Sequence, residues 1–151
     1  MIHLIKRFVG HLSAKALTPA EVEHVSMLLP EPLADLFFTM TVADQRHAFD
    51  VYLRTGGDPR LAEAALMHDI GKVAAPIGPL TRSFATVLAA CHVPLTGSWA
   101  IYRDHGPIGA EMLAAVGASD FTVTFTRTHP DPPPAGINTD SWERLAQADR
   151  L

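Results

Sequence analysis

Apolar residues recur every three or four positions along most of the chain, which is the spacing of helices that bury one face. The segment Thr18-Pro19-Ala20-Glu21 begins such a helix, because threonine can cap it, proline suits its first turn and glutamate completes a capping box. We therefore predict an all-α fold, a helical bundle of about seven helices joined by short loops. Other predicted helices begin at Asp58-Pro59 and Ser141 or cover residues 1–12 and 83–90.

One segment gives conflicting signals. Phe121-Thr122-Val123-Thr124-Phe125 alternates apolar and polar residues and is rich in β-branched side chains, so its local propensity favours a strand. No partner strand is visible elsewhere in the sequence. We therefore predict a helix here, capped by Ser119 or Asp120.

The composition narrows the class of protein. Hydrophobic residues make up 48% of the 151 residues and charged residues 19%, which is typical of a single globular domain. A net charge of −4 argues against nucleic acid as the main partner. The single cysteine, Cys91, excludes an intramolecular disulfide, so we expect a reducing, cytoplasmic environment. No apolar run approaches the ~20 residues of a membrane span, so we expect no membrane partner.

The most informative stretch joins a histidine, an aspartate, a glycine and a lysine at a predicted helix end. His68 and Asp69 are adjacent, and neighbouring helical residues point about 100° apart. The pair therefore reaches one ion only at a helix end or in a crease between helices. Gly71 can release the chain from helical geometry, and Lys72 brings a mobile positive charge that could receive a phosphate oxygen.

Four further residues are candidates for the same centre. His47 lies within a predicted helix, His105 begins one, His129 precedes a proline-rich loop, and Asp149 lies near the chain end. A helical bundle can bring such side chains together in its core. Imidazole and carboxylate ligands without a thiolate suit Fe, Mn, Co, Ni, Mg or Zn. Six ligands with a bridging carboxylate suffice for two ions, which can hold a hydroxide and clamp a phosphate ester.

This pattern resembles a known family. His47, His68-Asp69 and the late Asp149 look like the H…HD…D pattern of the HD-domain superfamily of metal-dependent phosphohydrolases. Residues 68–72 match the HDIGK form of its central motif. Residues 105–113 are similar to the H-x-x-x-G-A-E-x-L segment of the binuclear branch, where another histidine follows as His129 does here. The resemblance begins at about residue 44, so we expect residues 1–40 to be an N-terminal helical extension packed on an HD-type metal-binding domain, residues 41–151. Together they would form one compact structural domain.

The resemblance implies the roles of these residues. The ligands implied for the first ion are His47, His68, Asp69 and Asp149. Asp69 would bridge to a second ion held by His105 and His129. The implied cofactors are two divalent ions, Fe or Mn ahead of Mg, Co, Ni or Zn. Asp69 and Lys72 are the implied catalytic residues, and Lys72 would also contact the scissile phosphate. The implied reaction is hydrolysis of a nucleotide-like phosphomonoester or phosphodiester by a metal-bound hydroxide.

The sequence departs from one branch of the family. Cyclic-dinucleotide phosphodiesterases of the binuclear branch carry paired histidines and a Gly-Tyr-Pro signature, whereas here His129 stands alone before a proline-rich loop and the signature is absent. That substrate is therefore not expected.

Two alternatives to a phosphohydrolase stay open. The first is a di-iron oxygenase of the superfamily, whose ligands the same six residues also resemble. The second is a non-catalytic HD module that binds a ligand or a regulatory partner. A homo-oligomer is compatible with either.

Overall fold

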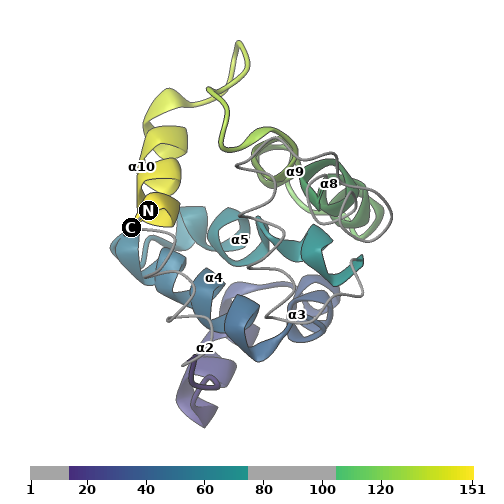
Figure 1. Ribbon diagram of the computed structural model, residues 1–151, viewed down its shortest axis with the longest axis vertical. Coiled ribbons are helices and arrows are strands. Elements are labelled where there is room, and N and C mark those ends of the chain that lie inside the picture. The colour runs from purple at the N-terminus through teal and green to yellow at the C-terminus, as the bar shows by residue number, and fades with distance from the viewer. Residues whose placement is uncertain (1–13, 75–104) are drawn as a thin grey trace, which may run out of the picture.

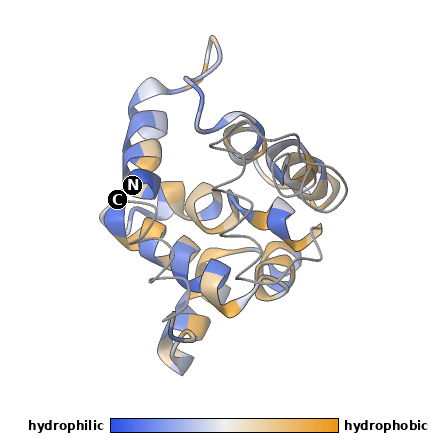
Figure 2. Cartoon of the chain, in the orientation of Figure 1, coloured by the Kyte–Doolittle hydropathy of each residue, from blue (hydrophilic) through white to orange (hydrophobic). Residues whose placement is uncertain are grey.

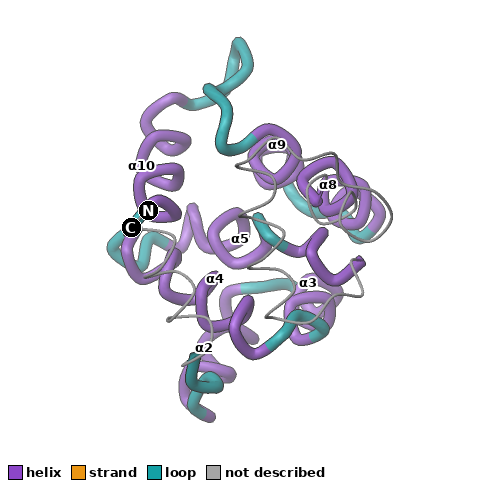
Figure 3. The backbone as a smooth tube through the Cα atoms, in the orientation of Figure 1, coloured by secondary structure: helices purple, strands orange, loops and turns teal. Residues whose placement is uncertain are grey.

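The computed structural model describes residues 14–74 and 105–151, and within these ranges the chain forms seven α-helices, one 3-10 helix and no strand (Figure 3). This confirms the predicted all-α class. The predicted helices over 1–12 and 83–90 lie outside the described residues. None of the helices described is long and apolar enough to cross a membrane. The helices are α2 (Pro19–Leu28), α3 (Glu31–Phe38), α4 (Val42–Arg54), α5 (Pro59–Met67), the 3-10 helix η1 (Ile70–Ala74), α8 (His105–Ala115), α9 (Asp120–Thr128) and α10 (Thr139–Arg150).

Side-chain caps fix where the helices begin. Thr18 and Glu21 form the predicted capping box at α2, in which the Thr18 backbone N–H donates to the Glu21 carboxylate at 2.7 Å. Asp58 caps α5 as expected. The start predicted for the last helix was wrong, because the Asn138 side chain accepts from the Ser141 backbone N–H and begins α10 at Thr139.

The conflicting segment is a helix, α9, as predicted. Its two phenylalanines are four residues apart, so a helix places both rings on one face, and their centroids lie 6.3 Å apart. That face packs on Trp142 of α10, whose ring lies 4.8 Å from Phe125. Ser119 caps the first turn. Burial of this aromatic face outweighs the local preference for a strand.

Helix α5 lies at the centre of the described fold (Figure 1). It contacts α2, α3, α4, α9 and α10. Six of its nine residues are buried, and three of these are alanines, whose small side chains let neighbouring helices approach closely. Figure 2 shows hydrophobic residues on α5 and on the helices around it. Because α5 is enclosed, the residues at its C-terminal end lie among several other helices.

The described part of the N-terminal region, residues 14–40, packs on the same core. Val25 of α2 and Phe37 of α3 are fully buried in the hydrophobic cluster that also contains α5 residues. Arg46 of α4 adds polar links, because its guanidinium donates to the Glu21 carboxylate and to the backbone carbonyl of Lys15. These contacts join α2 and α3 to the helices that carry the candidate site.

Helix α8 packs directly against η1 through glycines. A Cβ atom on Gly71 would lie 1.9 Å from the His105 carbonyl oxygen and 2.7 Å from the Gly109 backbone nitrogen. Any side chain at Gly71 would therefore separate the two elements. The expectation that Gly71 releases the chain from helical geometry was wrong, since η1 runs through it and it is not among the glycines with positive φ. Gly71 is required for the close approach that brings His105 to Asp69.

Candidate metal centre

The structure brings all six sequence-predicted ligands together. Each comes from a different part of the fold: α4, the C-cap of α5, the α5–η1 junction, the first residue of α8, the C-cap of α9 and the last turn of α10. Their ligand atoms form three overlapping groups, each with its atoms within 4.8 Å of one another. The groups are His47, His68 and Asp69; His68, His129 and Asp149; and Asp69, His105 and His129.

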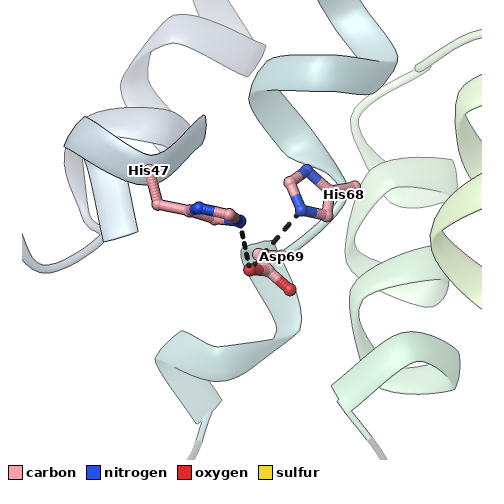
Figure 4. A group of neighbouring side chains, drawn as sticks. All are labelled: His47, His68 and Asp69. Atoms are coloured by element: carbon pink, nitrogen blue, oxygen red, sulfur yellow. Dashed lines mark ion pairs between the residues drawn. The ribbon is translucent and has the colours of Figure 1, made fainter. Parts of the chain in front are cut away.

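Asp69 lies between the histidines and faces them with both oxygens. Its Oδ1 lies 3.2 Å from Nε2 of His105. Its Oδ2 lies 3.5 Å from Nε2 of His68 and 3.8 Å from Nε2 of His47 (Figure 4). Because the two oxygens face different histidines, this carboxylate has the arrangement needed to bridge two ions.

Asp149, near the end of α10, contributes the second carboxylate of the centre. Its Oδ1 lies 3.0 Å from Nε2 of His47 and 3.4 Å from Nε2 of His68. Both histidines therefore point their Nε2 atoms at two carboxylates. Helix α10, which contacts α4 and α5, holds Asp149 in this place.

Backbone carbonyls orient two of the histidine rings. The Nδ1–H of His68 donates to the Ala65 carbonyl at 2.9 Å, and that of His129 donates to the Phe125 carbonyl at 3.1 Å. These bonds leave both Nε2 atoms directed at the centre, which is the usual arrangement of metal-binding histidines. His68 is only 1% exposed, and its buried Nε2 has no hydrogen-bond partner. A buried polar atom without a partner is rare, and a metal ion would satisfy it.

The charged groups perturb one another strongly. Burial opposes ionisation, but the carboxylates of Asp69 and Asp149 outweigh it and raise the pKa of His68 to about 9. Burial also opposes ionisation of Asp69, yet Lys72 and His68 hold the pKa of that carboxyl well below its usual range. The pKa of Asp149 is likewise lowered against the effect of burial, by the hydrogen bond from His47 and by the positive charge of the His68 ring. Burial lowers the pKa of His129 to about 4, with the charge of His68 adding to the effect.

These shifts set the protonation states near neutral pH. Both carboxylates are ionised and His129 is neutral, which are the forms that bind metal ions. His68 holds a proton between the two carboxylates, where a cation is favoured. The centre therefore attracts positive charge although it is largely buried.

The structure places the Lys72 ammonium against Asp69. Its Nζ donates to Oδ2 of Asp69, and its backbone N–H donates to the Asp69 carbonyl at 3.0 Å. The Lys72 side chain is 15% exposed. Whether Lys72 also contacts a phosphate, as the resemblance implies, stays a prediction.

Sequence reasoning missed Phe125. Its ring stacks on that of His129 with centroids 5.0 Å apart and an interplanar angle of 4°, and it packs edge-on against His68 at 6.5 Å. Its carbonyl also accepts the hydrogen bond that orients His129. The available signal was the spacing of four residues, which puts Phe125 and His129 on the same face of α9.

Comparison of the chain with models of protein families, with curated proteins and with solved structures found no match. Membership of the HD superfamily therefore stays a prediction from the motif residues.

Proposed function

We propose that this protein is a metal-dependent phosphohydrolase of the HD type, which cleaves a small phosphomonoester or phosphodiester such as a nucleotide. The observation that carries the proposal is the convergence of six histidine and aspartate side chains into three groups that overlap at His68, Asp69 and His129. Exposed acidic clusters are common on protein surfaces, but here Asp69 is 3% exposed and His68 is 1% exposed. Desolvating such groups is costly unless a partner compensates them.

The donor set fits divalent transition metals. Four imidazoles and two carboxylates suit Fe or Mn, and also Co, Ni or Zn, better than Mg, which prefers oxygen ligands. The buried Nε2 of His68, which makes no hydrogen bond, would exchange its proton for one ion. In this proposal His47, His68, Asp69 and Asp149 hold the first ion. His105 and His129 hold the second, and Asp69 is shared. Bound ions would supply an activated water and neutralise charge on the phosphate oxygens.

The charge of the centre favours an anionic substrate. The two carboxylates balance only half of the charge of two divalent ions, and Lys72 adds a further positive charge. A loaded centre therefore attracts anions, and a phosphate ester provides them. This argument favours hydrolysis over oxygenase chemistry on the same ligands. We also infer a small-molecule substrate and a cytoplasmic location, in keeping with the net charge of −4 and the single cysteine.

Metal content is the first test. Anaerobically purified protein should carry about two equivalents of metal, and His129→Ala should carry about one. The matched control is His24→Ala, because His24 packs on Phe49 and Tyr52 and is not one of the clustered ligands. One equivalent in the wild type, unchanged by His129→Ala, would contradict the second ion.

Activity is the second test. The protein loaded with Mn or Fe should hydrolyse members of a panel of nucleotide-like phosphate esters, and Asp69→Asn should abolish this while His24→Ala keeps it. Metal binding with no hydrolysis, and iron in a mixed-valence state, would favour the oxygenase alternative. No metal under any loading condition would contradict the enzyme and favour a ligand-binding module.

A further inference from the structure

We propose that Lys72 competes with the metal for Asp69. In the metal-free protein the Lys72 ammonium is bound to the Asp69 carboxylate, and this contact limits how tightly the centre binds divalent ions. This inference rests on the metal site of the proposed function. It differs from the phosphate-binding role implied by the family resemblance, because it concerns the protein before any substrate is present.

The local backbone brings the two residues together. Asp69 directly precedes the 3-10 helix η1, and Lys72 is three residues later. In a 3-10 helix the side chains at positions i and i+3 eclipse, so a carboxylate and an ammonium at this spacing lie on one face. The Lys72 backbone N–H donates to the Asp69 carbonyl at 3.0 Å, which closes this turn. The fold of residues 69–72 therefore places Lys72 on the same face as Asp69, and its side chain is only 15% exposed.

The oxygen that Lys72 occupies is also one that the centre would use. Lys72 donates to Oδ2 of Asp69, and this same oxygen faces His68 at 3.5 Å and His47 at 3.8 Å. Oδ1 instead faces His105 at 3.2 Å. An ion bound by His47, His68 and Asp69 must therefore share Oδ2 with the ammonium or displace it. The competition acts on this group in particular.

Burial makes the competition strong. The Asp69 side chain is 5% exposed and that of Lys72 is 15% exposed, so water and salt screen the pair poorly. A charge-assisted hydrogen bond in such surroundings is stronger than one on the surface. Removing the ammonium takes away a partner of a buried carboxylate, which destabilises the metal-free protein. A metal ion can replace that partner, so the metal-bound protein should tolerate the loss.

The test is Mn²⁺ titration of the full-length, metal-free protein by calorimetry, together with thermal unfolding with and without Mn²⁺. Lys72→Met removes the ammonium and keeps much of the aliphatic chain. The matched control is Lys15→Met, which makes the same change at an exposed lysine. The charge-retaining variant is Lys72→Arg.

We expect Lys72→Met to bind Mn²⁺ about tenfold more tightly than the wild type, the size of effect associated with one charge-assisted hydrogen bond. Its Tm should fall without metal and should not fall at saturating Mn²⁺. Lys15→Met should change neither quantity, and Lys72→Arg should bind Mn²⁺ as weakly as the wild type. A purely structural ion pair would instead lower the Tm with and without metal and leave Mn²⁺ affinity unchanged.

The outcomes separate this inference from the proposed function. If the wild type binds Mn²⁺ and Lys72→Met binds it equally or more weakly, the competition is contradicted while the metal site stands. If the wild type binds no Mn²⁺, the metal site itself fails and the inference fails with it. Should Lys72→Met not fold, NMR spectroscopy of the wild type tests the proposal instead. The chain has only three lysines, so the Nζ resonance of Lys72 can be assigned. If the metal displaces the ammonium, this resonance must shift when diamagnetic Zn²⁺ is added. An unchanged resonance at saturating Zn²⁺ would overturn the proposal.

Discussion

The Nε2 atom of His47 lies 3.0 Å from Oδ1 of Asp149, although 102 positions separate the two residues in the sequence. The contact joins α4 to the last turn of α10. Because Asp149 also faces His68 at 3.4 Å, it draws two histidines of the candidate centre towards one carboxylate. The end of the described chain therefore belongs to the centre as much as the His-Asp pair does.

Asp149→Ala should remove the first ion and leave the second. His47 and His68 both lose the carboxylate they face, whereas His105 keeps Oδ1 of Asp69. We expect the metal content to fall from about two equivalents to about one. Metal analysis of the purified variant checks this, with Asp131→Ala in the exposed proline-rich loop as the control. Full retention of both ions would contradict the role of Asp149.

Gly71→Ala should separate α8 from η1. The added Cβ would lie 1.9 Å from the His105 carbonyl, so the backbone must move and His105 must leave Asp69. We expect a loss of about 2–4 kcal/mol in the free energy of unfolding, measured by urea denaturation, and loss of the second ion. Gly136→Ala is the control, because it adds the same methyl group where no atom lies within 4 Å of the new Cβ. Its φ of +85° is unfavourable for alanine. It should cost about 1 kcal/mol and leave the metal content unchanged.

Much of the fold could be predicted because its signals are local. The capping box at Thr18, the cap at Asp58 and the helical spacing of apolar residues lie within single helices. The start of α10 was wrong because Asn138 and Ser141 are both good caps, and local sequence does not choose between them. The helix at Phe125 was predicted only because no partner strand is visible in the sequence.

The six candidate ligands could be named from the motif, but their arrangement could not. Which oxygen of Asp69 faces His105 depends on how closely α8 approaches η1. That distance is short because Gly71 has no side chain and packs directly against the α8 backbone. The Lys72 contact depends on a 3-10 turn after Asp69, where the sequence pattern suggested only that the helix ends. Contacts between elements distant in sequence leave no local signal.

Phe125→Leu should weaken binding of the second ion as well as the fold. The variant keeps an apolar side chain but loses the ring stacked on His129 with centroids 5.0 Å apart. We expect a loss of about 1–2 kcal/mol in stability from the smaller side chain and the lost stacking. Mn²⁺ affinity of the weaker site, measured by calorimetry, should fall about tenfold as the ring loses its fixed orientation. Phe49→Leu is the control, because Phe49 is buried against His24 and Tyr52, so that variant should lose stability without losing affinity.

The Glu21–Arg46 pair should make stability depend on pH in the acid range. Hydrogen bonds from Arg46, and then from the Thr18 backbone N–H, lower the pKa of Glu21 from 4.5 to about 2. Because the folded-state pKa is the lower one, the stabilisation is complete above about pH 4.5 and is lost as the pH falls towards 2. Glu21→Gln should therefore be less stable than the wild type by about 1 kcal/mol near neutral pH. The difference in free energy of unfolding between the two, measured by urea denaturation at a series of pH values, should shrink towards zero on acidification. A difference that stays constant down to about pH 2 would show that Glu21 contributes through packing and not through its charge.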